Sequence, residues 1–352
     1  MILKNLKKLS GPILVTGHTG FKGTWMILLL EALGIEWAGL SLPPKADSLY
    51  STIGLKNQGN EIFIDIRNLN LLIDAVKSIN PSVIIHLAAQ PLVLESYFSP
   101  YETFSTNVTG TINVLEAASK NKSTEITALI TTDKVYQNSG SGKPYKEKDR
   151  IGGNEPYSSS KAAAESVIAG WQQIYHERGG SFPIALRAGN VVGGGDLAPN
   201  RLMPDIIRAL QSNSTIKIRN PKSSRPWLHV LDPLYGYLLA IDKSIEDKSH
   251  CVFNFGPSGK SLKVQNVLDI ALDKWSIPHS IEIEFTSEMQ YESKFLNLDS
   301  NLSNTFLNWW PKYSQVESIE ITMEWWINYL SNGFEPLDLC RKDIVHFLGL
   351  TN

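Results

Sequence analysis

Cysteine is scarce in this sequence of 352 residues, which carries only Cys251 and Cys340. Two thiols supply neither the several bridges of a disulfide-stapled domain nor the ligand cluster of a structural zinc site. Such low cysteine use is typical of a reducing cytosol. We therefore expect no metal site and no chemistry at sulfur, and we interpret both cysteines as small apolar residues of the core.

The sequence also lacks a dominant charge and a long apolar run. Its 33 Lys and Arg against 35 Asp and Glu leave a formal net charge of −2, which gives no electrostatic reason to bind nucleic acid. The longest apolar run, Trp25–Leu30, falls far short of the roughly 20 residues that span a bilayer. The opening MILKNLKKLSGP lacks the apolar stretch of a signal peptide. We expect a cytoplasmic protein with neither a membrane nor a nucleic-acid partner.

What the sequence does contain is an alternation of short apolar runs with longer segments of helical periodicity. A hydrophobic content of 42% is enough for a substantial core. Strands are predicted at 13–16, 37–42, 61–66, 82–88, 126–131 and 183–187, and helices at 25–33, 69–79, 104–118 and 162–175. Strands that alternate with helices form parallel crossovers, so we predict an α/β fold with a Rossmann-type, doubly wound parallel sheet.

The second half is less regular and predicts a smaller, mixed α/β lobe. Helices are predicted at 202–211, 231–241, 264–275 and 319–330, and strands at 215–219, 252–255 and 281–285. The polar stretch 137–150, rich in Gly, Ser and Lys, predicts a loop. We find no internal repeat and no long linker.

Gly17, Gly20 and Gly23 form a glycine-rich turn between the first predicted strand and the first predicted helix. Glycine in this position permits a tight turn, close approach of the backbone to a pyrophosphate, and close packing of helix on strand. The helix N-terminus adds free N–H groups for phosphate. The turn therefore predicts a dinucleotide-binding domain over 1–187, with a return segment near 228–256. The substrate lobe over 188–352 is interleaved with it.

Several residues around this turn leave details of the cofactor open. His18 and Lys22 are bulky and polar where small or apolar residues would pack more simply, and Lys22 either contacts phosphate or is solvated. The acidic residue that usually holds the adenosine ribose is missing after the second strand, where Ser41 and Lys45 stand. The residues alone therefore do not choose between NAD and NADP. Asp65 either binds the adenine amino group or caps a turn.

A tyrosine and a lysine open the predicted helix at 162–175. Tyr157 and Lys161 are four residues apart and so share one helix face. A cation beside a phenol lowers its pKa, which makes Tyr157 a usable proton acceptor for a sugar hydroxyl. Thr132 follows the strand at 126–131 and is expected at the carboxyl edge of the sheet, beside Tyr157. Asp133 acts as an acid in a partly closed site or merely caps the strand end.

These motifs resemble the extended short-chain dehydrogenase/reductase superfamily and, within it, the family of CDP-glucose 4,6-dehydratases. The glycine turn and Y-x-x-x-K are typical of the superfamily, whereas G-H-T-G-F-K-G, A-A-Q-P-L-V and T-D-K-V-Y point to the CDP-sugar branch. The resemblance implies bound NAD and a lyase that converts CDP-glucose to CDP-4-keto-6-deoxyglucose, in deoxysugar biosynthesis for lipopolysaccharide O-antigen. Another nucleotide-sugar 4,6-dehydratase, or a 4-epimerase or reductase on the same scaffold, is the alternative.

The resemblance also implies roles for single residues. Tyr157 is the base, supported by Lys161 and Thr132, and Asp133 is the acid for water loss from carbon 6. Lys134 stands where dTDP-sugar relatives carry glutamate, which leaves the carbon 5 base open. Expected cofactor contacts are Gly17, Gly20, Phe21, Lys22, Gly23, Asp65, Ile66, Ala88, Ala89, Gln90, Asn107, Tyr157 and Lys161. Expected substrate contacts are Gln90, Asn190, Arg201, Arg219 and Arg225, because an arginine fork suits a diphosphate.

Two further expectations concern the branch and the assembly. Leu94 follows Q-P-L-V where the CDP branch usually has arginine, which puts the substrate in doubt more than the reaction type. In the resembled family, helices corresponding to 104–118 and 162–175 pair in a four-helix interface. The resemblance therefore implies a homodimer or a tetramer.

Overall fold

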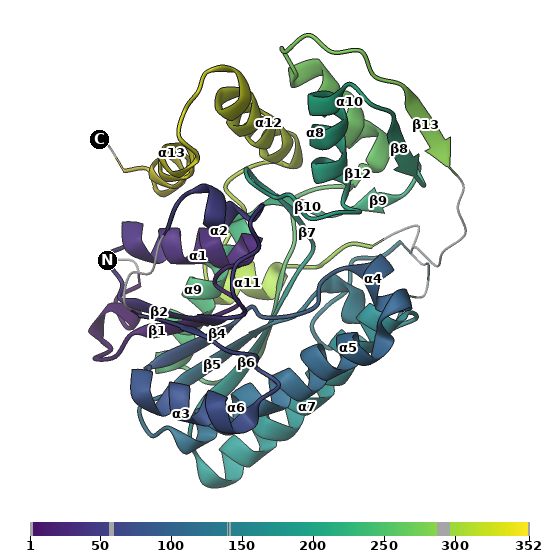
Figure 1. The fold of residues 1–352 in the computed structure, drawn as a ribbon. Helices are drawn as coiled ribbons and strands as arrows, with labels where there is room; N and C mark the ends of the chain where they lie inside the picture. Colours follow the sequence, from purple (N-terminus) through teal and green to yellow (C-terminus); the bar gives the residue numbers. More distant parts are fainter. Residues whose placement is uncertain (1–2, 56–59, 139, 141, 287–295, 351–352) are drawn as a thin grey trace.

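The centre of the molecule is a parallel sheet, seen in a computed structural model that describes residues 3–55, 60–138, 140, 142–286 and 296–350 (Figure 1). Its strands are β1 (Ile13–Thr16), β2 (Trp37–Ser41), β3 (Glu61–Phe63), β4 (Val83–His86), β5 (Ile126–Ile130), β6 (Phe182–Ala188) and β11 (Val252–Phe255). They lie in the order β11-β6-β5-β4-β1-β2-β3, and each neighbouring pair is parallel. The order reverses between β1 and β4, where a doubly wound sheet opens a crevice at its carboxyl edge. The predicted fold class is confirmed.

Helices cover both faces of this sheet. The helices are α1 (Phe21–Ala32), α2 (Leu49–Thr52), α3 (Leu69–Ile79), α4 (Val93–Phe98), α5 (Pro100–Phe104), α6 (Gly110–Lys120), α7 (Pro156–Arg178), α8 (Leu202–Ser212), α9 (Leu231–Glu246), α10 (Val264–Lys274), α11 (Asn301–Phe306), α12 (Gln315–Ser331) and α13 (Pro336–Leu348). Figure 1 shows α3, α6 and α7 on one face and α1 and α9 on the other.

Burial on both faces explains why the strands are apolar throughout rather than alternating. Ile13 and Val15 of β1 belong to the large core under α1 and α9, while Leu14 belongs to the smaller core under α3 and α6. In β4, Ile85 belongs to the large core and Ile84 to the smaller one. Successive side chains of a strand point to opposite faces, so a strand covered on both sides must be apolar at every position.

The second half of the chain adds a smaller mixed region beside the sheet's carboxyl edge (Figure 1). Its short strands are β7 (Asn190–Val192), β8 (Ile216–Arg219), β9 (Ser224–Arg225), β10 (Trp227–His229), β12 (Leu262–Lys263) and β13 (Ile283–Thr286). They pair as β10 with β7, β12 with β9, and β13 with β8. β11 returns to the main sheet beside β6. The division into a cofactor domain over 1–187 and an interleaved lobe stays a prediction.

The helix predicted at 104–118 is interrupted. A π-helical turn over Ser105–Thr109 separates α5 from α6. Such turns insert one extra residue and are frequent at functional sites. This one carries the buried Asn107, whose side chain bonds to two other segments described below. The helices α2, α4, α11 and α13 were not predicted from the sequence.

Candidate active site

The glycine turn leaves an open backbone cradle between β1 and α1. Gly17 has a φ of +73°, and a Cβ added there would lie 2.7 Å from the backbone nitrogen of Ala88. A Cβ on Gly23 would lie 2.1 Å from the carbonyl oxygen of Gly17, so both positions exclude a side chain. Gly20 is the N-cap residue of α1, and the first N–H groups of a helix lack partners within it. This arrangement fits the pyrophosphate of a dinucleotide.

His18 packs inward behind the turn, which accounts for a bulky residue at this position. Its ring is fully buried, and a Cβ on Gly39 would lie 2.7 Å from it. The ring nitrogen Nε2 lies 2.9 Å from Oε1 of the buried Glu61, which also accepts a hydrogen bond from Tyr50. Burial lowers the pKa of His18, against the pull of Glu61.

The Lys22 side chain extends to Tyr237 of α9. Its Nζ donates to the hydroxyl of Tyr237 at 3.4 Å and lies 5.7 Å from the centre of that ring. Burial, helped by the positive charges of Arg201 and Lys161, lowers the pKa of Lys22 to about 7, and Asp133 opposes this. Contact between Lys22 and a cofactor stays a prediction.

At the adenosine end, the candidate residues are partly occupied by contacts within the protein. Asp65 accepts hydrogen bonds from Nε of Arg67 at 2.9 Å and from its Nη2 at 2.6 Å, and these hold the pKa of Asp65 below its usual range. The side chain of Ile66 is buried in the core under α6, and its carbonyl oxygen accepts a hydrogen bond from Asn113 at 2.9 Å. Ser41, at the end of β2, bonds to Thr19 at 3.0 Å.

The loop after β4 is tied to the helix that carries Tyr157 and Lys161. Asn107 accepts from the backbone nitrogen of Gln90 at 2.8 Å, and donates to the carbonyl oxygen of Gln90 at 3.0 Å and to Ser160 at 2.9 Å. The Gln90 side chain donates to Thr103 at 2.8 Å. Ala88 and Ala89 are half-buried in the same loop. Asn107 thus positions the loop, while ligand contacts by Gln90 stay a prediction.

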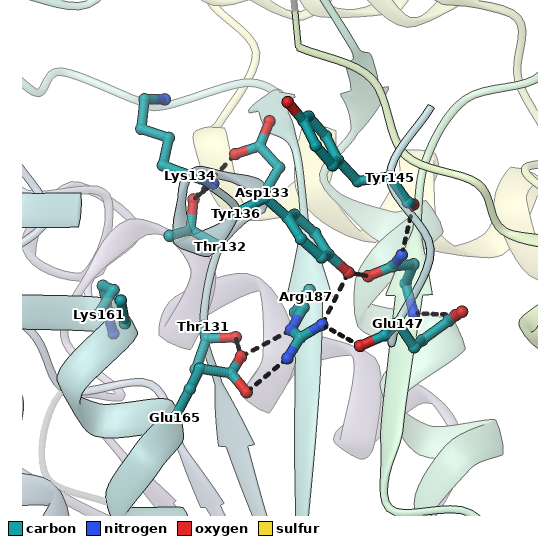
Figure 2. A network of polar contacts seen from close by, with 12 residues as sticks. Thr131, Thr132, Asp133, Lys134, Tyr136, Tyr145, Glu147, Lys161, Glu165 and Arg187 are labelled. Carbon is teal, nitrogen blue, oxygen red and sulfur yellow. Dashed lines mark hydrogen bonds and ion pairs between the residues drawn. The ribbon is translucent and has the colours of Figure 1, made fainter. Parts of the chain in front are cut away.

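Thr132, Asp133 and Lys134 leave β5 in a single 3-10 turn at the carboxyl edge of the sheet (Figure 2). The Thr132 hydroxyl donates to Oδ1 of Asp133 at 2.9 Å and accepts from the backbone nitrogen of Lys134 at 3.3 Å. Asp133 is 1% exposed, and its Oδ2 has no hydrogen-bond partner among the residues that the structure describes. A buried carboxylate oxygen without a protein partner is available to a ligand.

Tyr157 and Lys161 occupy the first turns of α7, as predicted. The helix begins with a capping box, in which the Glu155 carboxylate accepts from the backbone nitrogen of Tyr157 at 2.6 Å. Burial raises the pKa of Tyr157 to about 12, while the charge of Arg201 and a hydrogen bond with Thr132 oppose the rise. Lys161 donates to the carbonyl oxygen of Ile130 at 3.2 Å. The positive charge that opposes this rise in the pKa of Tyr157 is thus that of Arg201, whereas the sequence predicted that of Lys161.

The expected substrate residues differ in their positions. Arg201 precedes α8, and its Nη1 lies 3.4 Å from Oδ2 of Asp196. The positive charge of Arg201 opposes the rise in the pKa of Tyr157 and helps to lower the pKa of Lys22. Asn190 begins β7 and is half-buried. Arg225 is 4% exposed and donates to its neighbour Ser224. The backbone of Arg219 ends β8, but its side chain lies outside the described part of the chain.

Three further residues near these groups, Tyr237, Glu165 and Arg187, were not predicted from the sequence. Glu165 stands four residues after Lys161 on the same helix, and Arg187 interrupts an otherwise apolar strand, FPIALRA. A charge inside a buried strand is a signal that a partner is required. Tyr237 in α9 gave no such signal, because a tyrosine on an apolar helix face is ordinary core.

Comparison with known proteins decides the family. Residues 13–256 match the model of the NAD dependent epimerase/dehydratase family. The chain belongs to this family. The expected superfamily and the expected NAD dependence are thereby confirmed, and the glycine cradle fits that cofactor.

Individual members of this family resemble the chain to different degrees. It is 35% identical to the CDP-glucose 4,6-dehydratase of Salmonella typhimurium over 96% of both chains. It is 26% identical to a probable dTDP-glucose 4,6-dehydratase of Sinorhizobium fredii, over 92% of this chain and 95% of the relative. The solved structure of MoeE5 in complex with UDP-glucose and NAD matches 91% of this chain and 100% of its own, with a TM-score of 0.78 at 24% identity. This last likeness establishes the fold alone.

Within the described residues, no helix combines the length and the apolar content needed to cross a bilayer. The described part of the chain also holds no group of three or more His, Cys, Asp or Glu side chains arranged to bind a metal ion.

Proposed function

We propose that this protein is a nucleotide-sugar 4,6-dehydratase that converts CDP-glucose to CDP-4-keto-6-deoxyglucose. One observation supports the reaction type. Thr132 donates a hydrogen bond to the buried carboxylate of Asp133 and also bonds with the phenol of Tyr157, so that the two groups lie in one site. The 35% identity with a CDP-glucose 4,6-dehydratase over nearly the whole chain supports the substrate. The product would enter deoxysugar biosynthesis, of the kind that builds lipopolysaccharide O-antigen.

The cofactor would be held mainly by the glycine turn. Gly17 and Gly23 leave room for its pyrophosphate at the N-terminus of α1, and the loop fixed by Asn107 would border it. When bound, NAD would supply a hydride carrier between sugar carbon 4 and sugar carbon 6 that is regenerated in each cycle. The net reaction is therefore the elimination of water.

The proton transfers fall to side chains of this chain. Tyr157 removes the proton of the carbon 4 hydroxyl, with the Thr132 hydroxyl to orient that group. The positive charge of Arg201 stabilises the phenolate that results. Asp133 gives a proton to the hydroxyl that leaves carbon 6. Lys134 extends from the same turn and serves either as the base for the carbon 5 proton or as the cation that stabilises the enolate (Figure 2).

Asp133 also favours a dehydratase over an epimerase. An epimerase returns the hydride to carbon 4 and needs no acid at carbon 6. A carboxyl group that is 1% exposed loses most of its hydration, which costs free energy unless a ligand compensates. Oδ2 of Asp133, which has no partner among the described residues, is available to contact the hydroxyl that leaves carbon 6.

A panel of sugar nucleotides tests the proposed function. The enzyme with NAD would be incubated with CDP-, dTDP-, UDP- and GDP-hexoses, and the keto sugar would be measured by its ultraviolet absorbance in alkali. We expect kcat/KM for CDP-glucose to exceed that for each other substrate by at least about tenfold. A site that hydrogen-bonds cytosine would leave its polar groups unpaired with another base. No product from any substrate would refute the dehydratase. Preference for another nucleotide would correct the substrate.

We also propose a homodimer formed through α6 and α7, the helices at 104–118 and 162–175, with an interface that extends over the adjoining α4 and α5. Phe98 and Tyr101 are 83% and 79% exposed, and Phe104 is also exposed, which is unusual for aromatic side chains on a monomer's surface. Light scattering at micromolar concentration should give the mass of a dimer or tetramer. The double variant Phe98→Glu/Tyr101→Glu should give a monomer. A monomeric wild-type protein would refute the assembly.

A further inference from the structure

A buried ion pair lies beneath the turn that carries Thr132, Asp133 and Lys134 (Figure 2). Arg187 of β6 donates from Nε to Oε1 of Glu165 in α7 at 2.8 Å, and from Nη2 to Oε2 at 2.8 Å. Each side chain is 4% exposed. The two parallel bonds are the geometry that gives an arginine–carboxylate pair its directional specificity.

The pair holds the turn at both of its ends. Thr131, just before the turn, donates its hydroxyl proton to Oε1 of Glu165 at 2.6 Å. Tyr136, just after it, accepts from Nη1 of Arg187 at 2.7 Å, and the guanidinium carbon lies 4.9 Å from the ring centre. Residues 132–135 therefore span two points of attachment to one ion pair.

The attachment at Tyr136 extends into neighbouring segments. The Tyr136 hydroxyl donates to Asn254 of β11 at 2.7 Å, and Asn254 in turn donates to the carbonyl oxygen of Tyr145 at 2.9 Å. The rings of Tyr136 and Tyr145 stack with centres 4.9 Å apart. Nη1 of Arg187 also donates to the carbonyl oxygen of Glu147 at 2.9 Å. The network thus connects the turn with the sheet and with the loop at 137–150.

Stability alone does not explain a charged pair at this place. Removing two charges from water is costly, and apolar side chains of similar volume are often as stable or more so. A fully bonded ion pair instead selects one arrangement of the groups attached to it. The same Glu165 carboxylate lies one helical turn after Lys161, and its charge opposes the fall in the pKa of Lys161, which burial lowers to about 8.

We propose that Glu165, Arg187 and Tyr136 are positioning residues, which fix the turn over 132–135 so that Thr132 and Asp133 meet the substrate in reactive geometry. This inference rests on the proposed function for the reaction that it serves. A carboxyl group displaced by about 1 Å can cost a large factor in rate, because proton transfer requires close approach. The network itself touches the turn and not the sugar.

The first test removes one hydroxyl. Tyr136→Phe loses the bonds to Arg187 and Asn254 but keeps the ring and its stacking. We expect kcat to fall about tenfold, or about 1.4 kcal/mol in activation free energy, with KM within twofold. Tyr313→Phe is the control, because it removes the hydroxyl of another buried tyrosine, which bonds at 2.9 Å to His346 of α13. The kcat of Tyr313→Phe should equal that of wild type, while its Tm should fall about as far as that of Tyr136→Phe.

Hydrogen exchange of residues 131–136, measured without substrate, separates this inference from the proposed function. Exchange should be at least tenfold faster in Tyr136→Phe and unchanged in Tyr313→Phe. If exchange changes as expected but no sugar nucleotide is turned over, the proposed function fails and the positioning role stands. If Tyr136→Phe matches the control in both exchange and kcat, the positioning role is refuted.

The second test replaces the ion pair with apolar residues. Glu165→Leu/Arg187→Met removes both charges together, so neither member of the pair stays buried without the other. We expect a folded protein whose Tm lies within a few degrees of wild type but whose kcat is at least tenfold lower. Retention of kcat within twofold by the folded double variant would show that the pair is only structural. If the double variant does not fold, Tyr136→Phe and its control decide.

Discussion

Tyr157→Phe is expected to lower kcat by roughly 10²–10⁴-fold, because a phenyl ring cannot accept the proton of the carbon 4 hydroxyl. The ring is 8% exposed and would keep its packing, and the capping box at Glu155 bonds to the backbone rather than to the phenol. Tm should therefore stay within a few degrees of wild type, and NAD should bind as before. Steady-state kinetics with CDP-glucose, calorimetry with NAD and thermal unfolding measure the three quantities. A variant with kcat within threefold of wild type would remove Tyr157 as the base.

The pH profile of the wild type provides a second check on the same residue. Burial raises the pKa of Tyr157 to about 12, and the charge of Arg201 works against that rise. The active form of a base is the deprotonated one, so kcat/KM should rise as pH increases on the acid side of the profile. Arg201→Met removes a charge that favours the phenolate, and should shift this acid limb toward higher pH. Loss of substrate affinity alone would lower the profile without shifting the limb.

The parts of the site that the sequence predicted are those whose geometry is set within one element or at the end of one. The glycine turn links one strand to one helix, Tyr157 and Lys161 lie on one face of α7, and Thr132 follows β5 directly. Each of these arrangements follows from the periodicity of a helix or the alternation of the fold. Short-range spacing was therefore enough to predict them.

The parts that were missed depend on distances between elements far apart in sequence. Arg201 acts on Tyr157 across 44 residues of chain, and Lys22 bonds to Tyr237, which is 215 residues away. No local pattern encodes such a meeting. The cation predicted to lower the pKa of Tyr157 was Lys161, because a spacing of four residues places both side chains on one helix face. In the fold, that effect comes from Arg201.

The interruption of the helix predicted at 104–118 has a similar origin. Its apolar spacing is compatible with a continuous helix, but the π-helical turn over Ser105–Thr109 is retained by tertiary bonds. Asn107 in this turn bonds to Gln90 and to Ser160, and so connects α5 and α6 with the loop after β4 and with α7. Tertiary contacts override helical propensity at this point.

Asp133→Asn is expected to slow the elimination of water strongly while leaving the oxidation at carbon 4 nearly unchanged. The amide keeps an oxygen that can accept from the Thr132 hydroxyl at the present 2.9 Å, so the turn should retain its shape. An amide cannot protonate the hydroxyl that leaves carbon 6, so elimination should slow by roughly 10²–10⁴-fold. Oxidation at carbon 4 depends on Tyr157 and should stay within about threefold of wild type.

A single turnover with excess enzyme resolves these two steps. Absorbance near 340 nm follows oxidation at carbon 4, and the alkaline absorbance of the keto sugar follows the product. In Asp133→Asn, the first signal should rise at the wild-type rate and persist, because the following elimination has become slow. Solvent deuterium at carbon 5 of the product should likewise appear more slowly.

The matched control for this variant is Asp242→Asn. Asp242 accepts from the backbone nitrogens of Asn5 and Leu6, both at 2.8 Å, and so is a bonded carboxylate of α9 with a structural role. Its conversion to asparagine should leave both steps unchanged. If Asp133→Asn forms product and incorporates deuterium at the wild-type rate, Asp133 is not the acid. The buried carboxylate would then serve only to orient Thr132, and Asp133 would no longer favour elimination over epimerisation.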